Sequence, residues 1–276
     1  MSEISGETGR VELLPAQRHA TILDYLRINT VASIQQLATA LGASESTVRR
    51  DLRDLVEKGY LERTHGGAII RHQPETRFEP DPSIAAASAR PQKQAIGAVA
   101  AGAVASGQSL ILDASSTVLA AAECILKRQI NLTIVTNDLN CSHLFSAGHH
   151  GPVIVTGGTI RPASTTLVGE PAQRFLAGIH VDIAFIGVHT ISGGVFTETS
   201  LEVAGMKQLM IRAAKRVIVL ADSSKFGTPS FCEIGRVADV DEVITDDGAT
   251  TEQIEAIRAE GTICTVAGLQ PETRRS

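Results

Sequence analysis

Residues 44–52 read Ser-Glu-Ser-Thr-Val-Arg-Arg-Asp-Leu, and this stretch predicts the start of a helix with two unlike faces. The side-chain oxygen of Ser44 is suited to cap the helix, because it can accept a hydrogen bond from an unpaired N–H group of the first turn. Apolar residues then recur at helical spacing at Val48, Leu52 and Leu55. One face of the helix is therefore expected to be buried.

The opposite face of this helix is polar and basic. Guanidinium groups on such a face can read guanine edges in the major groove of DNA or bind its phosphates. A small helical bundle with a solvated charged face would give the same local pattern, so the neighbouring segments decide between the two. The candidate DNA-contacting residues are Ser44, Ser46, Thr47, Arg49, Arg50, Arg53 and, in a later turn, His65.

Two further helices precede this one. Apolar spacing predicts a helix over residues 15–29, and a short second helix follows, with Ser33 suited to cap it and Gly42 to end it. A short helix, a tight turn containing glycine and a capped basic helix form a helix-turn-helix, which places its second helix in the major groove.

A strand–turn–strand pattern follows the third helix. Residues 60–63 and 68–70 bracket the turn His65-Gly66-Gly67, which is typical of a hairpin. The hairpin makes the helix-turn-helix a winged one. The ordered set of elements predicts a DNA-binding domain over residues 13–71.

Length and composition leave room for a second domain. The chain has 276 residues, of which 43% are apolar and only 3% aromatic, so stacking platforms for single-stranded nucleic acid are not expected. No apolar run approaches the roughly 18 residues that cross a bilayer, and residues 1–10 are too polar for a signal peptide. We therefore expect a cytoplasmic protein that does not contact membranes.

The charge is distributed unevenly along the chain, whose net charge is −5. Residues 10–72 contain nine Lys/Arg and seven Asp/Glu, whereas residues 73–276 contain 16 basic and 21 acidic groups. A slightly basic N-terminal part (the head, residues 10–72) followed by an acidic remainder (the body, residues 73–276) fits a DNA-binding domain joined to a second domain of another kind. Neither a metal site nor a cofactor is expected, because the cysteines lie far apart without metal-ligand spacing: Cys124, Cys141, Cys232 and Cys264.

Residues 72–92 contain four prolines and no clear periodicity, which predicts a semi-extended linker. From residue 93 to residue 266, near-continuous apolar runs alternate with Ala- and Leu-rich helical stretches such as 118–127 and 201–214. This alternation is typical of a parallel sheet covered on both faces, an α/β fold of the Rossmann-like kind. The expected strands are residues 109–112, 132–135, 153–156, 183–187, 217–221 and 243–245.

Polar and glycine-rich segments follow several of these strands. In open α/β sheets, ligands bind beyond the carboxyl ends of the strands. The first strand ends in Asp113-Ala114-Ser115-Ser116-Thr117 and passes into a helix, whose free N–H groups and hydroxyls can hold a phosphate. Arg161, after two glycines, offers a fork of donors to an anion.

Each such segment also has a structural explanation as a helix cap, a turn or a surface ion pair. Five such segments follow strands of the predicted sheet and so lie at one of its edges. This shared position favours a ligand site over a separate structural role for each segment. The candidate ligand-binding residues are Asp113, Ser115, Ser116, Thr117, Thr136, Asn137, Gly157, Gly158, Arg161, Gly187, His189, Asp222 and Lys225.

The head resembles the DNA-binding domain of the DeoR family of bacterial transcriptional regulators. The residues that support this resemblance are Arg18, Ile22, Leu26, the run 44–52, Leu55, Gly59, Leu61 and the turn 64–68. The body resembles the family's effector domain, whose fold is similar to ribose-5-phosphate isomerase. The family motifs match Glu202 in addition to the strand-end residues. Two positions differ from the family pattern: Ser115 stands where a glycine is usual, and Thr190 where a second glycine often follows Gly187.

The resemblance implies a repressor of a carbohydrate or polyol operon that leaves its double-stranded operator when a phosphorylated sugar or polyol binds. We expect a homodimer or tetramer, because one helix-turn-helix reads only a few base pairs. We do not expect an enzyme. A sugar-phosphate isomerase fused to a DNA-binding head stays an alternative, with Asp113 and Glu202 as possible bases. A constitutive DNA-binding protein with a degenerate sensor is a third.

Overall fold

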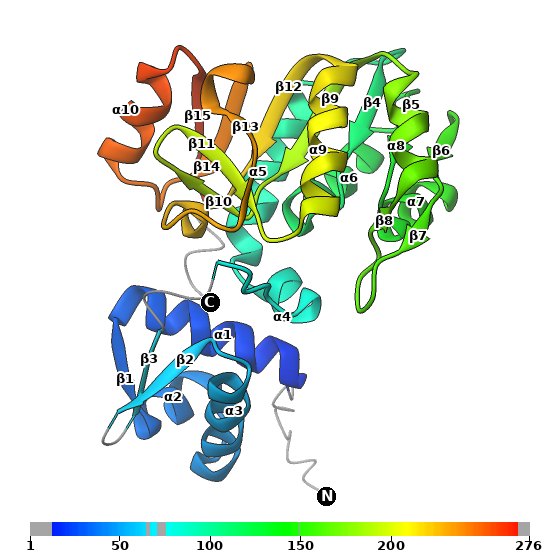
Figure 1. Cartoon of the computed structure of the whole chain (residues 1–276). Helices are drawn as coiled ribbons and strands as arrows, with labels where there is room; N and C mark the ends of the chain where they lie inside the picture. Colours follow the sequence, from blue (N-terminus) through cyan, green and yellow to red (C-terminus); the bar gives the residue numbers. More distant parts are fainter. Residues whose placement is uncertain (1–12, 65–66, 71–75, 149, 270–276) are drawn as a thin grey trace, which may run out of the picture. The chain divides into compact units, whose positions relative to one another are not determined.

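The computed structural model describes residues 13–64, 67–70, 76–148 and 150–269 of the chain. They form two compact units, whose helices and strands are labelled in Figure 1. The N-terminal unit takes in residues up to 72 together with 83–88, and the C-terminal unit takes in 73–82 and the residues from 89 onward.

The N-terminal unit contains the predicted helix-turn-helix. Its helices are α1 (Pro15–Asn29), α2 (Ile34–Leu41), α3 (Glu45–Glu57) and most of α4 (Pro82–Ala87). The hydroxyl of Ser33 accepts a hydrogen bond from the Gln36 N–H at 3.2 Å, and Ser44 caps α3 in the same way through the Thr47 N–H at 3.2 Å. Gly42 ends α2 in the left-handed conformation, with φ of 60°. The helix boundaries therefore follow from the expected capping residues.

A three-stranded antiparallel sheet completes the N-terminal unit. Its strands are β1 (Val31–Ser33), β2 (Leu61–Thr64) and β3 (Gly67–Ile70), in the order β1-β3-β2. The hairpin of β2 and β3 was predicted from the sequence, whereas β1 was not. Gly67 pairs with Ser33, and a Cβ atom on Gly67 would lie 1.9 Å from the carbonyl oxygen of Ala32. Only glycine therefore allows β1 to approach β3 this closely.

A buried ion pair joins two helices of this unit. Arg18 on α1 donates from its Nε to one carboxylate oxygen of Asp51 on α3 at 2.7 Å and from a terminal nitrogen to the other at 3.0 Å. The Asp51 side chain is only 2% exposed. Sequence reasoning treated both residues as parts of a family motif. In the structure they fix α3 against α1, beside the apolar core that includes Ile22, Leu26 and Leu55.

A parallel sheet forms the centre of the C-terminal unit. Among the described residues it has seven strands in the order β15-β14-β12-β9-β4-β5-β6, all paired in parallel. Their bounds are β4 (Ser109–Leu112), β5 (Thr133–Thr136), β6 (Val153–Val155), β9 (Val181–Gly187), β12 (Ala214–Leu220), β14 (Glu242–Asp246) and β15 (Ile263–Ala267). The six predicted strands are all present, with ends that differ by up to three residues, and β15 was not predicted.

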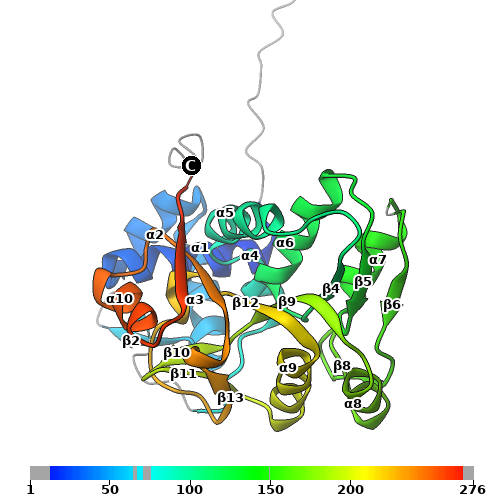
Figure 2. The same ribbon diagram turned by 90° about the horizontal axis from the view of Figure 1, so that it is seen from above.

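Helices cover both faces of this sheet, as the apolar strands predicted (Figure 2). The helices are α5 (Arg90–Gly102), α6 (Ser116–Lys127), α7 (Leu139–Ser146), α8 (Glu170–Ala177), α9 (Leu201–Ala213) and α10 (Thr251–Ala259). One core cluster includes Ile96 of α5 and Val118 of α6, and the other includes Leu176 of α8 and Met206 of α9. Residues 72–92 are not extended throughout, because α4 and the start of α5 lie within them. Both helices have proline in their first turn, where a missing N–H costs no helical hydrogen bond.

Smaller elements lie outside the seven-stranded sheet. They are the hairpin β7 (Thr159–Ile160) and β8 (Leu167–Val168), the antiparallel sheet of β10 (Thr190–Ser192), β11 (Val195–Glu198) and β13 (Cys232–Arg236), and the short 3-10 helices η1 (Ser223–Lys225) and η2 (Val237–Asp239). Sequence reasoning did not predict them. Within the described ranges, no helix combines the length and apolarity needed to cross a bilayer.

The strand order places a topological switch point between β4 and β9. From β4 the chain runs outward through β5 to β6, then returns to the other side of β4 at β9 and continues to β15. The connections after β4 and β9 therefore leave the sheet in opposite directions, which opens a crevice at the carboxyl ends of these two strands. This is the position at which ligands bind in open α/β sheets.

Candidate functional site

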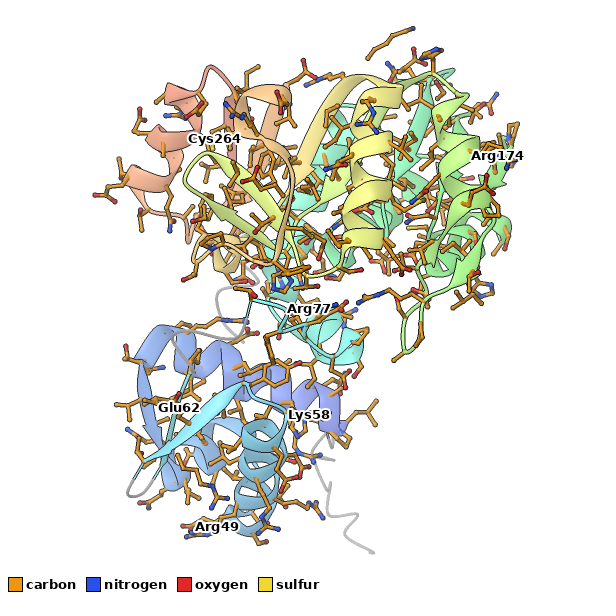
Figure 3. The ribbon with its side chains drawn as sticks, viewed as in Figure 1. Arg49, Lys58, Glu62, Arg77, Arg174 and Cys264 are labelled. Atoms are coloured by element: carbon orange, nitrogen blue, oxygen red, sulfur yellow. The ribbon has the colours of Figure 1, made fainter. Side chains whose placement is uncertain are left out.

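Helix α3 presents the basic face that the sequence predicted. Arg49, Arg50 and Arg53 are exposed, whereas Val48 and Leu52 on the other side are buried. Arg49 extends from α3 (Figure 3) and donates a hydrogen bond to Glu45 at 3.2 Å. The face thus offers guanidinium groups that are accessible to phosphates and base edges.

The first turn of α3 adds hydroxyl groups to this face. The Ser44 hydroxyl lies 2.8 Å from that of Ser46 and 2.9 Å from that of Thr47. Ser44 and Ser46 are exposed and Thr47 is half-buried. His65, which the sequence also nominated, lies outside the described residues.

At the switch point, Asp113 and Gly187 meet directly. Asp113 follows β4, and its carboxylate accepts a hydrogen bond from the N–H of Gly187, the last residue of β9, at 3.0 Å. The side chain of Ser115 packs against the same glycine, since a Cβ atom on Gly187 would lie 2.3 Å from both Cβ and Oγ of Ser115. Gly187 therefore provides the space that a serine at position 115 needs.

A buried lysine lies beside Asp113. The ammonium of Lys207 on α9 lies 2.6 Å from Glu198 and 3.5 Å from Asp113, and it donates to the carbonyl of Gly187 at 2.9 Å. Sequence reasoning missed both Lys207 and Glu198. The available signal was the position of Lys207 within the apolar stripe of Val203, Met206 and Met210, where a lysine needs a buried partner.

The three charges alter one another's proton affinity. Burial raises the pKa of Asp113, although Lys207 and the Gly187 N–H act against that rise. Burial also acts to raise the pKa of Glu198, but the charge and hydrogen bond of Lys207 outweigh it and leave this pKa at about 2. Glu198 is thus ionised and paired with Lys207. One oxygen of Asp113 is buried without a hydrogen-bond partner in the described part of the chain.

The ends of β4 and β5 are joined by side chains from the predicted set. Asn137 accepts a hydrogen bond from the Ala114 N–H at 3.0 Å, and the hydroxyl of Thr136 donates to the carbonyl of Leu112 at 2.7 Å. Ser115 caps α6 by accepting from the Thr117 N–H at 3.3 Å. These contacts hold the turn before α6, with the neighbouring Ser116 half-buried at the first position of the helix.

Asp222, His189 and Lys225 lie on the other side of β9. The Asp222 carboxylate accepts from the N–H of Ser224 at 3.1 Å and so fixes the turn that carries Lys225. Burial lowers the pKa of His189 to about 4, and the positive charge of Lys225 contributes in the same direction. His189 is therefore a neutral imidazole near neutral pH, close enough to Lys225 to feel its charge.

A pocket of ≈ 420 Å³ has Arg161 and Glu202 of the predicted set in its wall, and none of the other predicted ligand-binding residues lines it. Its other lining residues are Arg77, Glu79, Pro162 and residues 199–201. Arg161 forms a two-pronged ion pair with Glu79. Gly158 supports the hairpin that carries Arg161, because a Cβ atom there would lie 2.4 Å from the carbonyl oxygen of Val168. Gly157, beside it, has φ of 71°, which also favours glycine.

One group of potential metal ligands occurs among the described residues, in the N-terminal unit. His19, Asp51 and Asp54 have ligand atoms within 4.8 Å of one another. Both carboxylate oxygens of Asp51 already accept from Arg18, whose positive charge would oppose a cation. We assign this group to the packing of α1 on α3.

Both units match known family models. Residues 18–74 match the DeoR-like helix-turn-helix domain, and residues 88–247 match the DeoR C terminal sensor domain. The HTH-type transcriptional repressor GlcR of Bacillus subtilis is 34% identical over 83% of this chain and 88% of its own length. The HTH-type transcriptional regulator GlpR of Haloferax volcanii is 32% identical over 88% of this chain and 96% of its own.

Among solved structures, ribose 5-phosphate isomerase A from Methanocaldococcus jannaschii matches 49% of this chain and 53% of its own, with a TM-score of 0.37 and 16% identity. The family models and the two relatives span the helix-turn-helix and most of the C-terminal unit. The chain belongs to the DeoR family of helix-turn-helix transcriptional regulators.

Proposed function

We propose that this protein is a repressor of carbohydrate or polyol genes that binds operator DNA and is released by a phosphorylated sugar or polyol. The observation that carries the proposal is α3, a capped helix that buries Val48 and Leu52 and exposes Arg50 and Arg53. Recognition helices of this kind enter the major groove with their N-terminal residues toward the bases. The relatives' names, a repressor and a regulator, support the same activity. The protein then acts in the cytoplasm, beside the DNA that it binds.

The effector site in this proposal is the crevice between β4 and β9. The first turn of α6 offers N–H groups and the hydroxyl of the half-buried Ser116 to a phosphate, in the manner of helix N-termini, whereas Thr117 is only 3% exposed. Lys225 adds a positive charge. Glu202 and His189 offer hydrogen-bonding groups to the sugar or polyol, whereas Asn137 is fully buried with its amide bonded to Ala114 and Leu167. Asp113 is fully buried, so we assign it the role of holding Gly187 and Lys207 in place.

Operator recognition in this proposal requires two heads. Since one helix-turn-helix contacts a single half-site, specific binding calls for a symmetric dimer or tetramer. The C-terminal unit, with the larger surface, is the proposed source of the interface. Sedimentation of the full chain at micromolar concentration tests this step, and a monomer would contradict it.

The competing proposal is catalysis by the C-terminal unit. Isomerisation of a sugar phosphate needs a carboxylate that can take a proton from carbon. Asp113 is buried against Lys207, and Glu198 is a weak base with its pKa held at about 2. Glu202 lines the pocket and is the exposed alternative. An assay of ketose–aldose interconversion separates the two proposals.

The proposed function is tested in two steps with the full chain. Selection from a random pool of duplexes identifies the DNA that the protein binds. A thermal-shift screen then compares phosphorylated sugars and polyols with their unphosphorylated counterparts, because a bound ligand stabilises the folded state by RT ln(1 + [L]/Kd). We expect a shift with at least one phosphorylated compound and none with its counterpart. The absence of any selected DNA would overturn the proposal.

A further inference from the structure

Residues 76–81, which we call the strap, contact the rest of the C-terminal unit through several groups, among them Thr76, Arg77 and Glu79. The carbonyl of Thr76 accepts a hydrogen bond from the N–H of Phe231 at 3.1 Å. The guanidinium of Arg77, labelled in Figure 3, lies 4.9 Å from the centre of the Phe231 ring. The carboxylate of Glu79 accepts from two nitrogens of Arg161. One backbone hydrogen bond, one cation–π contact and one ion pair therefore help to fix the strap.

The strap forms one wall of the pocket described above. Arg77 and Glu79 line it from the strap, and Arg161 lines it from the β7–β8 hairpin. A volume of ≈ 420 Å³ falls within the range of small-molecule sites. The Arg161 side chain is 23% exposed and that of Glu79 is 40% exposed, so the ion pair can be reached from solvent.

The chemistry of the pocket suits an anion. The guanidinium fork of Arg161 matches the oxygens of a carboxylate and those of a phosphate equally well. Helix α9 begins at Leu201, and its N-cap Ser200, also in the pocket wall, makes no side-chain capping hydrogen bond. The helix therefore leaves N–H groups and a partial positive charge at this end, which favour an anion. A phosphoryl group carries more charge than the single carboxylate now held there.

We propose that Glu79 is a built-in occupant of the anion site on Arg161, and that a phosphoryl group displaces it and detaches the strap. The inference rests on the proposed function and adds a second anion site to it, because neither the first turn of α6 nor Lys225 lines the pocket that holds Arg161 and Glu79. In the chain, the strap leads directly into α4, most of which belongs to the N-terminal unit. Displacing Glu79 frees the segment that joins the two units. The ligand then binds the detached state better than the attached one, which is the differential affinity that any switch requires.

Hydrogen exchange at the amide of Phe231 tests this inference, because that N–H donates to the strap. Glu79→Gln removes the competing charge from a partly exposed residue. We expect it to speed exchange at Phe231 about two- to fivefold without added anion, the factor for losing one such ion pair. Glu170→Gln is the matched control, since Glu170 pairs with Arg174 on the surface of α8, away from the pocket. It should leave exchange at Phe231 unchanged.

The second arm uses inorganic phosphate as the probe, against potassium chloride at equal ionic strength. We expect phosphate to speed exchange at Phe231 in the wild type and in Glu170→Gln, and to add little in Glu79→Gln, where the carboxylate that phosphate displaces is already absent. Unchanged exchange in Glu79→Gln, or protection of Phe231 by phosphate, would overturn the inference.

The two proposals fail in different ways. If phosphorylated sugars release DNA while the Phe231 amide stays protected, the strap inference is wrong and the proposed function stands. If phosphate frees the Phe231 amide but no phosphorylated compound changes the affinity for the selected DNA, the proposed effector response is wrong and the assignment of Glu79 to the anion site stands.

Discussion

The ammonium of Lys207 lies 2.6 Å from Glu198 and 3.5 Å from Asp113, inside the C-terminal unit. The two carboxylates come from different strands, because Glu198 ends β11 and Asp113 follows β4. The lysine therefore ties α9 to the switch point of the sheet. Removing the one cation would leave two carboxylates buried together.

Lys207→Met is expected to destabilise the fold by about 3–5 kcal/mol, because a buried ionic partner is left uncompensated. Urea unfolding followed by circular dichroism measures the effect. Lys215→Met is the control, since Lys215 is 76% exposed in its ion pair with Asp182 and should cost about 1 kcal/mol or less. Equal stability of the two variants would show that the buried cluster is not ionic.

Gly187→Ala is expected to destabilise the protein by about 1–3 kcal/mol, because the added methyl group meets the side chain of Ser115. Ser115→Gly removes that side chain, so the double variant should recover much of the loss, with a favourable coupling of about 0.5–3 kcal/mol. Denaturant unfolding of the four proteins of the cycle gives the coupling directly.

Gly205→Ala, in the middle of α9, controls for a methyl group added to a glycine. A Cβ atom there would lie 3.5 Å from the nearest atom, on Gln173, which is an ordinary contact. Alanine favours helix over glycine by about 1 kcal/mol, so this variant should be as stable as the wild type or more stable. Strictly additive effects at positions 115 and 187 would contradict the packing of Ser115 on Gly187.

His189 should make stability fall between about pH 7 and pH 5. Its pKa is lowered from 6.5 to about 4 in the folded protein, so the unfolded chain binds the proton first as the pH falls. Acidification through this window therefore favours unfolding, and the effect is complete below about pH 4. Glu198, with its pKa at about 2, loses its contribution only at lower pH.

The measurement is the change in melting temperature between these two pH values. The change in melting temperature between about pH 7 and pH 5 should be smaller in His189→Gln than in the wild type. His180→Gln, at an exposed position, controls for the loss of an imidazole. An identical pH dependence in His189→Gln and the wild type would mean that His189 is not a buried neutral base.

The sequence predicted the parts of the fold whose burial is uniform. The strands β4 and β9 are buried on both faces, so they appear as apolar runs such as Ser-Leu-Ile-Leu at 109–112. Strand β15 lies at the edge of the sheet and buries only Cys264 and Ala267, with Ile263 59% exposed, and sequence reasoning missed it although Ile-Cys-Thr-Val-Ala is largely apolar. Strands β10 and β11 form a tight hairpin around Gly193-Gly194, a local signal that sequence reasoning missed. Strand β13 pairs with β11 from a distant part of the chain, which local patterns do not record.

The candidate site was predictable as a set of strand ends but not as a network. Asp113 and Gly187 were nominated separately, and their hydrogen bond follows only from the strand order. Lys207 was missed because a lysine in a helical stretch is usually solvated. Arg161 was nominated, whereas its partner Glu79 lies in residues 72–92, which we expected to be only a linker.

Arg50→Ala is expected to weaken binding to the selected DNA by about 1–3 kcal/mol and to relax the preference at one base position, if Arg50 reads a guanine edge. Fluorescence anisotropy at matched salt measures both effects. Arg174→Ala, on the exposed face of α8, controls for the loss of one surface arginine. Wild-type affinity in Arg50→Ala would move the DNA-reading face elsewhere.

The most direct test of the account is the release of bound DNA by a phosphorylated ligand. The full chain is saturated with its selected duplex, and anisotropy is followed as the phosphorylated compound from the thermal-shift screen, or its unphosphorylated counterpart, is added. We expect release by the phosphorylated compound alone, and DNA binding without release in Lys225→Ala at the same concentrations, because the helix amides hold the phosphate more weakly without that cation. DNA that stays bound to the wild type at saturating ligand, or release from Lys225→Ala at wild-type concentrations, would contradict it.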